Sequence, residues 1–236
     1  MELDSESWKT KPTDRFVLKW VKCNLSARIT PRLLGLEWLR PWMITACSTV
    51  LGVIAGVLFA LGWGFLAGVT AVFSQVFDGV DGQFARLKDK QSPTGALLDS
   101  SLDRYTDGSL MIGMTVYLIR LPSILPIGLL LCIASLAIIG SNLVSYSAAR
   151  AESLKIPLPP KPTLASKGTR TVVMALCGIL TPFWPALPLA ALCYIAVHTN
   201  LVFANRLVYA LGARAETRPE GREGERPENA GGRRNR

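Results

Sequence analysis

Two long stretches without a charged residue constrain this chain more than any other feature. One runs from Pro41 to Phe77 and the other from Leu121 to Ala149. Each is longer than the roughly 20 apolar residues that a helix needs to cross the hydrocarbon core of a bilayer. We therefore expect an all-α, polytopic membrane protein.

Breaks rich in glycine and proline divide the hydrophobic part of the chain into six predicted transmembrane helices. They are expected at residues 41–62, 64–88, 94–120, 123–151, 164–184 and 187–211. We interpret 41–212 as one membrane domain, 1–40 as an arm and 213–236 as a tail. The tail is polar and rich in Pro and Gly, so it is expected to be disordered in the cytoplasm.

Basic residues predict the orientation. The formal net charge is +9, and Lys and Arg collect in the arm, in "RLKDK" (86–90), in 152–170 and in the tail. The positive-inside rule then predicts an inner (cytoplasmic) membrane protein with both termini in the cytoplasm. Within the arm, "DRFVLKWVKCNLSARI" has the spacing of an interfacial amphipathic helix, and a short solvated helix is the alternative.

Four carboxylates interrupt the apolar pattern near the end of the second predicted span and near the start of the third. Asp78 and Asp81 share one face of the second span, and Asp99 and Asp103 share one face of the third. The turn "KDKQSP" folds these faces together, and nearby Gly and Ala residues allow the two backbones to approach closely. We expect all four side chains to point into one pocket.

Clustered carboxylates near a membrane need a cation. At ~4 Å each pair repels by about 4 kcal/mol at an effective dielectric of 20. Mg²⁺ or Mn²⁺ prefers oxygen ligands and commonly completes its shell with phosphates, and two ions fit four carboxylates. Such a pocket suits phosphoryl transfer. The alternative from the residues alone is a proton relay or a cation transporter.

The spacing of these residues resembles a family signature. Residues 78–103 read DxxDGxxAR, eight intervening residues, then GxxxDxxxD, and this resembles the CDP-alcohol phosphotransferase (phosphatidyltransferase) family at every fixed position. The resemblance implies six spans, commonly in a homodimer. It also implies that Asp78, Asp81 and Asp99 bind one metal ion, and that Asp78, Asp99 and Asp103 bind a second. Asp103 is then also the general base.

The same resemblance implies a site for the nucleotide of a CDP-linked donor. Gly82, Ala85 and Arg86 match positions that line the cytidine diphosphate site, and Ser92 matches a hydroxyl residue that touches it. "RPWMIT" resembles the family's PNxxT stretch at Pro41 and Thr45, with Trp42 where Asn is usual.

For the acceptor, "SNLVSYSAARAESL" resembles a stretch of members that use inositol phosphate. Arg150 matches that stretch, and Ala148 occupies the place of a usual basic residue. Lys167 and Arg170 in "SKGTR" resemble a basic pair that holds the acceptor's phosphate. Alternatively, both residues are ordinary positive charges at the cytoplasmic end of the fifth predicted span.

The resemblance implies a membrane transferase that moves a phosphatidyl-type group from a CDP-linked lipid or alcohol to an alcohol and releases CMP. A phosphorylated polyol such as inositol phosphate is the favoured acceptor, and glycerol 3-phosphate or a neutral alcohol is the alternative. A transporter and an inactive scaffold are the competing classes. Membrane lipid is an expected partner, and nucleic acid is not.

Overall fold

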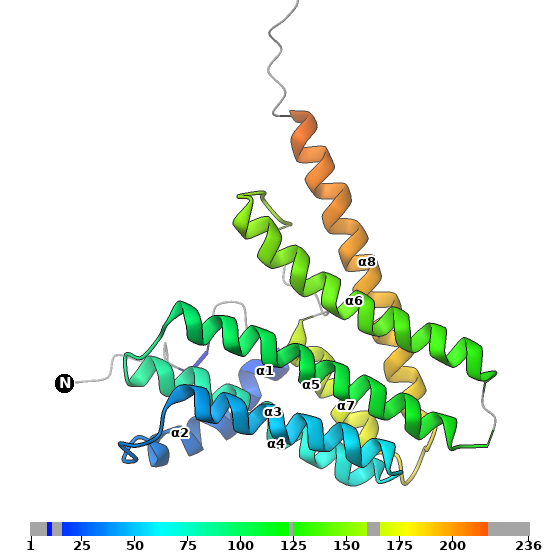
Figure 1. Ribbon diagram of the computed structural model, residues 1–236, viewed down its shortest axis with the longest axis horizontal. Helices are drawn as coiled ribbons and strands as arrows, with labels where there is room; N and C mark the ends of the chain where they lie inside the picture. Colours follow the sequence, from blue (N-terminus) through cyan, green and yellow to red (C-terminus); the bar gives the residue numbers. More distant parts are fainter. Residues whose placement is uncertain (1–8, 11–15, 123–124, 160–165, 217–236) are drawn as a thin grey trace, which may run out of the picture.

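The described part of the chain is built from helices (Figure 1). A computed structural model describes residues 9–10, 16–122, 125–159 and 166–216, and within these ranges it contains no strand. The helices, in chain order, are α1 (Phe16–Val21), η1 (Lys22–Ser26, a π-helical turn), α2 (Ala27–Leu33), α3 (Pro41–Ala60), α4 (Gly64–Leu87), α5 (Pro93–Ile119), α6 (Ile127–Ser153), α7 (Lys167–Ile179) and α8 (Leu187–Glu216).

Local sequence explains where the helices beside the site begin. Pro41 starts α3, where a missing N–H costs nothing. Ser92 caps α5, and its side chain accepts a hydrogen bond from the Gly95 N–H at 3.0 Å. Ser166 caps α7 in the same way by accepting from the Thr169 N–H. The starts of α3 and α5 line one pocket, and Lys167 at the start of α7 contacts Asp78 beside it.

Small residues allow the helices to pack closely. Helix α3 lies between α4 and α5, and α4 also packs against α7. A Cβ atom added to Gly113 of α5 would collide with the backbone of Gly56 in α3, and one added to Gly68 of α4 would collide with the backbone of α7. Close backbone contact of this kind is typical of helices packed within membranes. It fixes α4 and α5, the two helices that carry the carboxylates.

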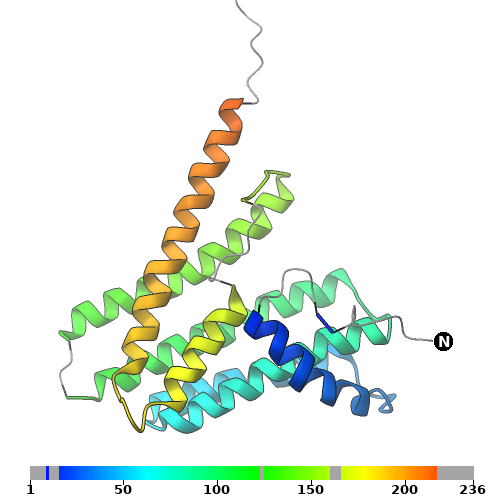
Figure 2. The same ribbon diagram turned by 180° about the vertical axis from the view of Figure 1, so that it is seen from behind.

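Helices α6 and α8 form a second group. They pack along each other, and contacts with α5 and α7 connect them to the rest of the bundle. In Figures 1 and 2 both helices lean away from α3–α5 toward their C-terminal ends, and α8 extends beyond the bundle. Helix α8 reaches Glu216, so residues 213–216 of the predicted tail are helical. Residues 217–236 lie outside the described part.

The arm is held against α4 by buried polar side chains. Ser26 donates to the Val76 carbonyl at 2.8 Å, and Thr30 donates to Gln83 Oε1 at 2.7 Å. The amide of Gln83 in turn donates to the Lys22 carbonyl at 3.0 Å. One side of the arm therefore packs on the helix that carries Asp78 and Asp81. Residues 1–8 and 11–15 of the predicted arm lie outside the described part.

Each of the six predicted spans contains a helix. Among the described residues, three helices are long and apolar enough to cross a bilayer: Pro41–Ala60, Ile127–Ser153 and Leu187–Gly212. The span expected at 164–184 is shorter in the structure, because α7 ends at Ile179 and a turn region follows through residue 186. Pro182 lies three residues beyond this end, a position typical of a proline that follows a helix.

Candidate active site

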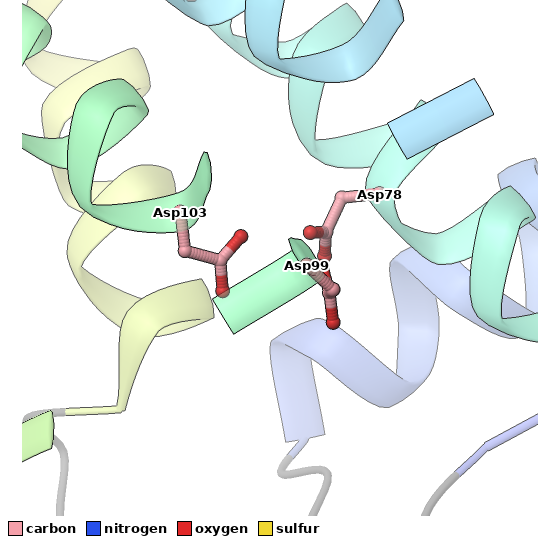
Figure 3. A group of neighbouring side chains, drawn as sticks. All are labelled: Asp78, Asp99 and Asp103. Atoms are coloured by element: carbon pink, nitrogen blue, oxygen red, sulfur yellow. The ribbon is translucent and has the colours of Figure 1, made fainter. Parts of the chain in front are cut away.

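A cluster of three carboxylates lies where α4 and α5 face each other. Asp78 comes from α4, and Asp99 and Asp103 come from α5 (Figure 3). One carboxylate oxygen from each lies within 4.8 Å of the others. Figure 3 shows the carboxyl group of Asp103 turned toward those of Asp78 and Asp99. The predicted convergence of the carboxylates is therefore found for these three residues. The predicted close approach of the α4 and α5 backbones is wrong, because α3 packs between the two helices and Gly79 faces Ser26 of the arm.

Asp81 lies one helical turn beyond Asp78 and faces a neighbouring pocket. It is only 6% exposed, and among the described residues its Oδ2 atom has no hydrogen-bond partner. A buried carboxylate oxygen without a donor is unfavourable unless a cation satisfies it. Asp81 and Asp99 both line the pocket, so the pocket adjoins the carboxylate cluster.

The pocket has a volume of about 390 Å³ and is built from the start of α3, the end of α4 and the start of α5. It is lined by all six residues that the family resemblance assigns to the nucleotide: Pro41, Thr45, Gly82, Ala85, Arg86 and Ser92. Trp42 and Lys90 line it as well. A Cβ added to Gly82 would meet the Arg86 guanidinium at 3.4 Å, so this guanidinium lies over the glycine.

Lys167 lies against the carboxylate cluster. Its Nζ atom forms ion pairs with Asp78 Oδ1 and with Asp103 Oδ1, which links α7 to both α4 and α5. All three side chains are about one fifth exposed, at 20% for Lys167 and 17% for each aspartate. Of the three residues predicted to bind the acceptor, Lys167 is therefore the one that contacts the carboxylates.

Arg170 is buried and paired elsewhere. Its Nη2 atom lies 2.5 Å from Asp107 Oδ2, and the two side chains are 1% and 3% exposed. Arg150, the third predicted acceptor residue, is exposed near the end of α6. Lys167 and Arg170 share one side of α7 but contact different carboxylates, so the structure does not show one cluster of the three cations.

Sequence reasoning missed two polar residues beside the cluster. Gln75, one turn before Asp78, donates to Asp78 Oδ2 at 3.1 Å. Asp107 binds Arg170 and accepts a hydrogen bond from Ser141 Oγ at 3.4 Å. The signal for Asp107 was present in the sequence, because it extends the i, i+4 series of Asp99 and Asp103 by one further turn.

The chemistry of these donors fits a hard divalent cation. The cluster offers carboxylate oxygens and no His or Cys, and Mg²⁺ and Mn²⁺ prefer such ligands. The partnerless Asp81 Oδ2 adds a further oxygen nearby. Arg86 and Lys90 on the pocket wall are suited to phosphate groups. A carboxylate cluster beside such a pocket is typical of enzymes that act on phosphate esters with the help of divalent cations.

Comparison with known proteins identifies the family. Residues 38–209 match the model of the CDP-alcohol phosphatidyltransferases, and the chain belongs to this family. The resemblance of the motif is thereby confirmed.

Several relatives are similar over part or most of their length. The chain is 31% identical to a phosphatidylinositol phosphate synthase of Cutibacterium acnes over 68% of this chain and 82% of that protein. It is 33% identical to a bifunctional IPC transferase and DIPP synthase of Thermococcus kodakarensis over 58% of this chain. The chain spans only 30% of that longer protein.

Solved structures share the fold. A crystal structure of Mycobacterium tuberculosis phosphatidylinositol phosphate synthase with CDP-DAG bound superposes with a TM-score of 0.67 at 24% identity. The match covers 79% of this chain and 93% of that one. A structure of the same synthase in complex with manganese and citrate gives a TM-score of 0.69 at 23% identity, over 79% of this chain and 89% of that one.

Proposed function

We propose that this chain is a membrane transferase that moves a phosphatidyl-type group from CDP-diacylglycerol or a similar CDP-linked donor to the hydroxyl group of a phosphorylated polyol, releasing CMP. One observation carries the proposal: the pocket lined by the six residues that the family resemblance assigns to the nucleotide adjoins the Asp78, Asp99 and Asp103 cluster through Asp99. A donor in this pocket would have its diphosphate beside the cluster.

Each group of residues has a chemical task in this reaction. Mg²⁺ or Mn²⁺, held as two ions by Asp78, Asp81, Asp99 and Asp103, would neutralise the diphosphate. Gly82 and Ala85 leave room for the nucleotide, and Arg86 pairs with phosphate oxygens. Asp103 accepts the proton of the acceptor's hydroxyl group as that oxygen attacks the β-phosphorus. The bond between the β-phosphorus and CMP breaks, and CMP leaves.

The acceptor is proposed to be inositol phosphate, with glycerol 3-phosphate as the second candidate. Relatives named as inositol phosphate synthases support this choice. Lys167 already lies at the cluster, and a lysine ammonium binds a phosphate as a mobile point charge. Arg150 and Arg170 are proposed to line the same side of the site. Transport is not favoured, because the names of the relatives describe transferases and synthases.

The protein is proposed to cross the inner membrane six times and to act as a homodimer with its site and termini in the cytoplasm. Helix α7 has 13 residues, or about 20 Å, so its span would include the turns at 180–186. Exposed tryptophans support two interfacial belts: Trp20, Trp38 and Trp42 near the site, and Trp63 and Trp184 in the opposite connections. In this arrangement the arm lies at the cytoplasmic interface with Trp20 toward lipid.

The acceptor class can be tested by comparing kcat/KM for myo-inositol 1-phosphate with myo-inositol, and for glycerol 3-phosphate with glycerol. The purified full-length chain would be supplied with CDP-diacylglycerol and Mn²⁺, and CMP release measured. We expect each phosphorylated acceptor to exceed its neutral counterpart, with inositol phosphate the best. Equal values for a phosphorylated acceptor and its neutral counterpart would contradict a phosphate-binding acceptor site.

A further inference from the structure

Lys167 forms a bridge between the two helices that carry the carboxylates. Its ammonium contacts Asp78 of α4 and Asp103 of α5, using the Oδ1 atom of each. Both aspartates belong to the three-carboxylate cluster. The positive charge of Lys167 therefore offsets the repulsion between two carboxylates from different helices.

A divalent cation bound by these aspartates would compete with Lys167. Mg²⁺ lies about 2.0–2.1 Å from its oxygen ligands, and an ammonium hydrogen-bonded to the same oxygens would then lie within a few ångströms of the ion. Two positive charges at that separation repel each other, and both need the same lone pairs. The ion and the ammonium cannot both keep close contact with Asp78 Oδ1 and Asp103 Oδ1.

The surroundings of Lys167 allow the side chain to leave while α7 stays in place. Lys167 is the first residue of α7, directly after the cap formed by Ser166. One turn later, Arg170 is tied to buried Asp107, and Gly168 packs against Leu18 of the arm so closely that it has no room for a Cβ. A rotation about the lysine's own bonds is therefore enough to move the ammonium.

We propose that Lys167 is an internal counter-ion that holds Asp78 and Asp103 together before a divalent cation binds, is displaced by that cation, and then binds the phosphate of the acceptor. The inference rests on the proposed function, since it assumes that these aspartates are metal ligands. It predicts an order of binding, cation first and acceptor second, because the Lys167 ammonium becomes available to the acceptor only after the cation is in place.

The first test measures Mn²⁺ affinity by electron paramagnetic resonance on the full-length protein in detergent. Lys167→Gln removes the competing charge, so its Kd for Mn²⁺ should be about tenfold lower than that of the wild type, or about 1.4 kcal/mol. Lys155→Gln is the matched control, because Lys155 is exposed in the turn just after α6, and its Kd should not change. Equal or weaker binding by Lys167→Gln would overturn the inference.

The second test needs no variant. Acetylation of Lys167 by an amine-reactive ester, read by mass spectrometry, should be slow without metal and should become several-fold faster with Mn²⁺, while Lys155 reacts equally in both states. Adding myo-inositol 1-phosphate to the Mn²⁺-loaded protein should restore protection, and myo-inositol should not. Reactivity of Lys167 that does not respond to Mn²⁺ would also overturn the inference.

These outcomes separate the inference from the proposed function. If Mn²⁺ binds to the wild type and Asp99→Asn abolishes this binding, but Lys167 neither competes nor changes its reactivity, only the inference fails. If neither the wild type nor Lys167→Gln binds Mn²⁺, the metal site itself is wrong, and both proposals fail.

Discussion

Breaking the buried ion pair between Arg170 and Asp107 on one side should strongly destabilise the α5–α7 contact. Its atoms lie 2.5 Å apart, and the side chains are 1% and 3% exposed. Replacing Arg170 by Met keeps the length of the side chain but removes the charge. Asp107 would keep only the hydrogen bond from Ser141 at 3.4 Å, and its Oδ1 already lacks a partner among the described residues.

The expected cost follows from this burial. Removing one partner of a buried pair leaves an uncompensated charge and typically costs about 3–5 kcal/mol. For a chain of this size, 1 kcal/mol shifts the melting temperature by about 2–4 °C, so Arg170→Met should lower it by about 6–20 °C. The double variant Asp107→Leu with Arg170→Met removes both charges and should recover most of this loss, because apolar replacement of a whole pair is often nearly neutral.

Thermal unfolding in detergent, followed by intrinsic tryptophan fluorescence, measures these shifts. Arg150→Met is the matched control, because Arg150 is exposed and such a change is usually worth less than about 0.5 kcal/mol. A single Arg170→Met variant as stable as the control, or a double variant no better than the single one, would refute the reasoning. A raised acceptor KM in Arg170 variants can be assigned to the acceptor site only when stability is preserved.

Three further changes probe the pocket and the cluster. Gly82→Ala should raise the KM for the CDP-linked donor about tenfold, because the added methyl group narrows the pocket. Gly108→Ala is the control: its Cβ would meet nothing within 4 Å, so the donor KM should not change. Equal effects of the two variants would contradict the pocket assignment. Gln75→Leu removes the hydrogen bond to Asp78 and should weaken Mn²⁺ binding about 10- to 100-fold; unchanged affinity would remove Gln75 from that task. Asp103→Asn should lower kcat about 10²- to 10⁴-fold with a near-normal donor KM, and wild-type kcat would exclude it as the base.

Helical spacing predicted which carboxylates share a face but not which helix each side chain meets. Asp78, Asp99 and Asp103 converge as the i, i+4 pattern and the short α4–α5 turn require. Asp81 follows Asp78 by three residues, and this further turn places it in the pocket lined by Thr45 of α3. That contact depends on how α3 packs between α4 and α5, which the spacing within α4 does not encode.

The predicted acceptor residues show a second limit of prediction from sequence spacing. Lys167 and Arg170 have the i, i+3 spacing of a pair, yet Lys167 meets Asp78 and Asp103 while Arg170 meets Asp107. Their partners lie one helical turn apart on α5, so the two cations separate along that helix. The registry of α7 against α5 is set by tertiary packing, including the close contact of α7 with Gly68 of α4, and the sequence of α7 alone does not contain it.

The measurement that tests the central claim most directly is CMP release from CDP-diacylglycerol with myo-inositol 1-phosphate, in Mn²⁺ and in chelator. The wild type should release CMP with Mn²⁺ and stop in chelator, and Asp99→Asn should be inactive in both. Asp89→Asn is the matched control, because Asp89 is exposed in the α4–α5 turn at φ 50°, a conformation that Asn accepts readily. It should keep wild-type activity. CMP release that persists in chelator, or that survives in Asp99→Asn, would contradict a cation-dependent transferase built on the α4–α5 carboxylates.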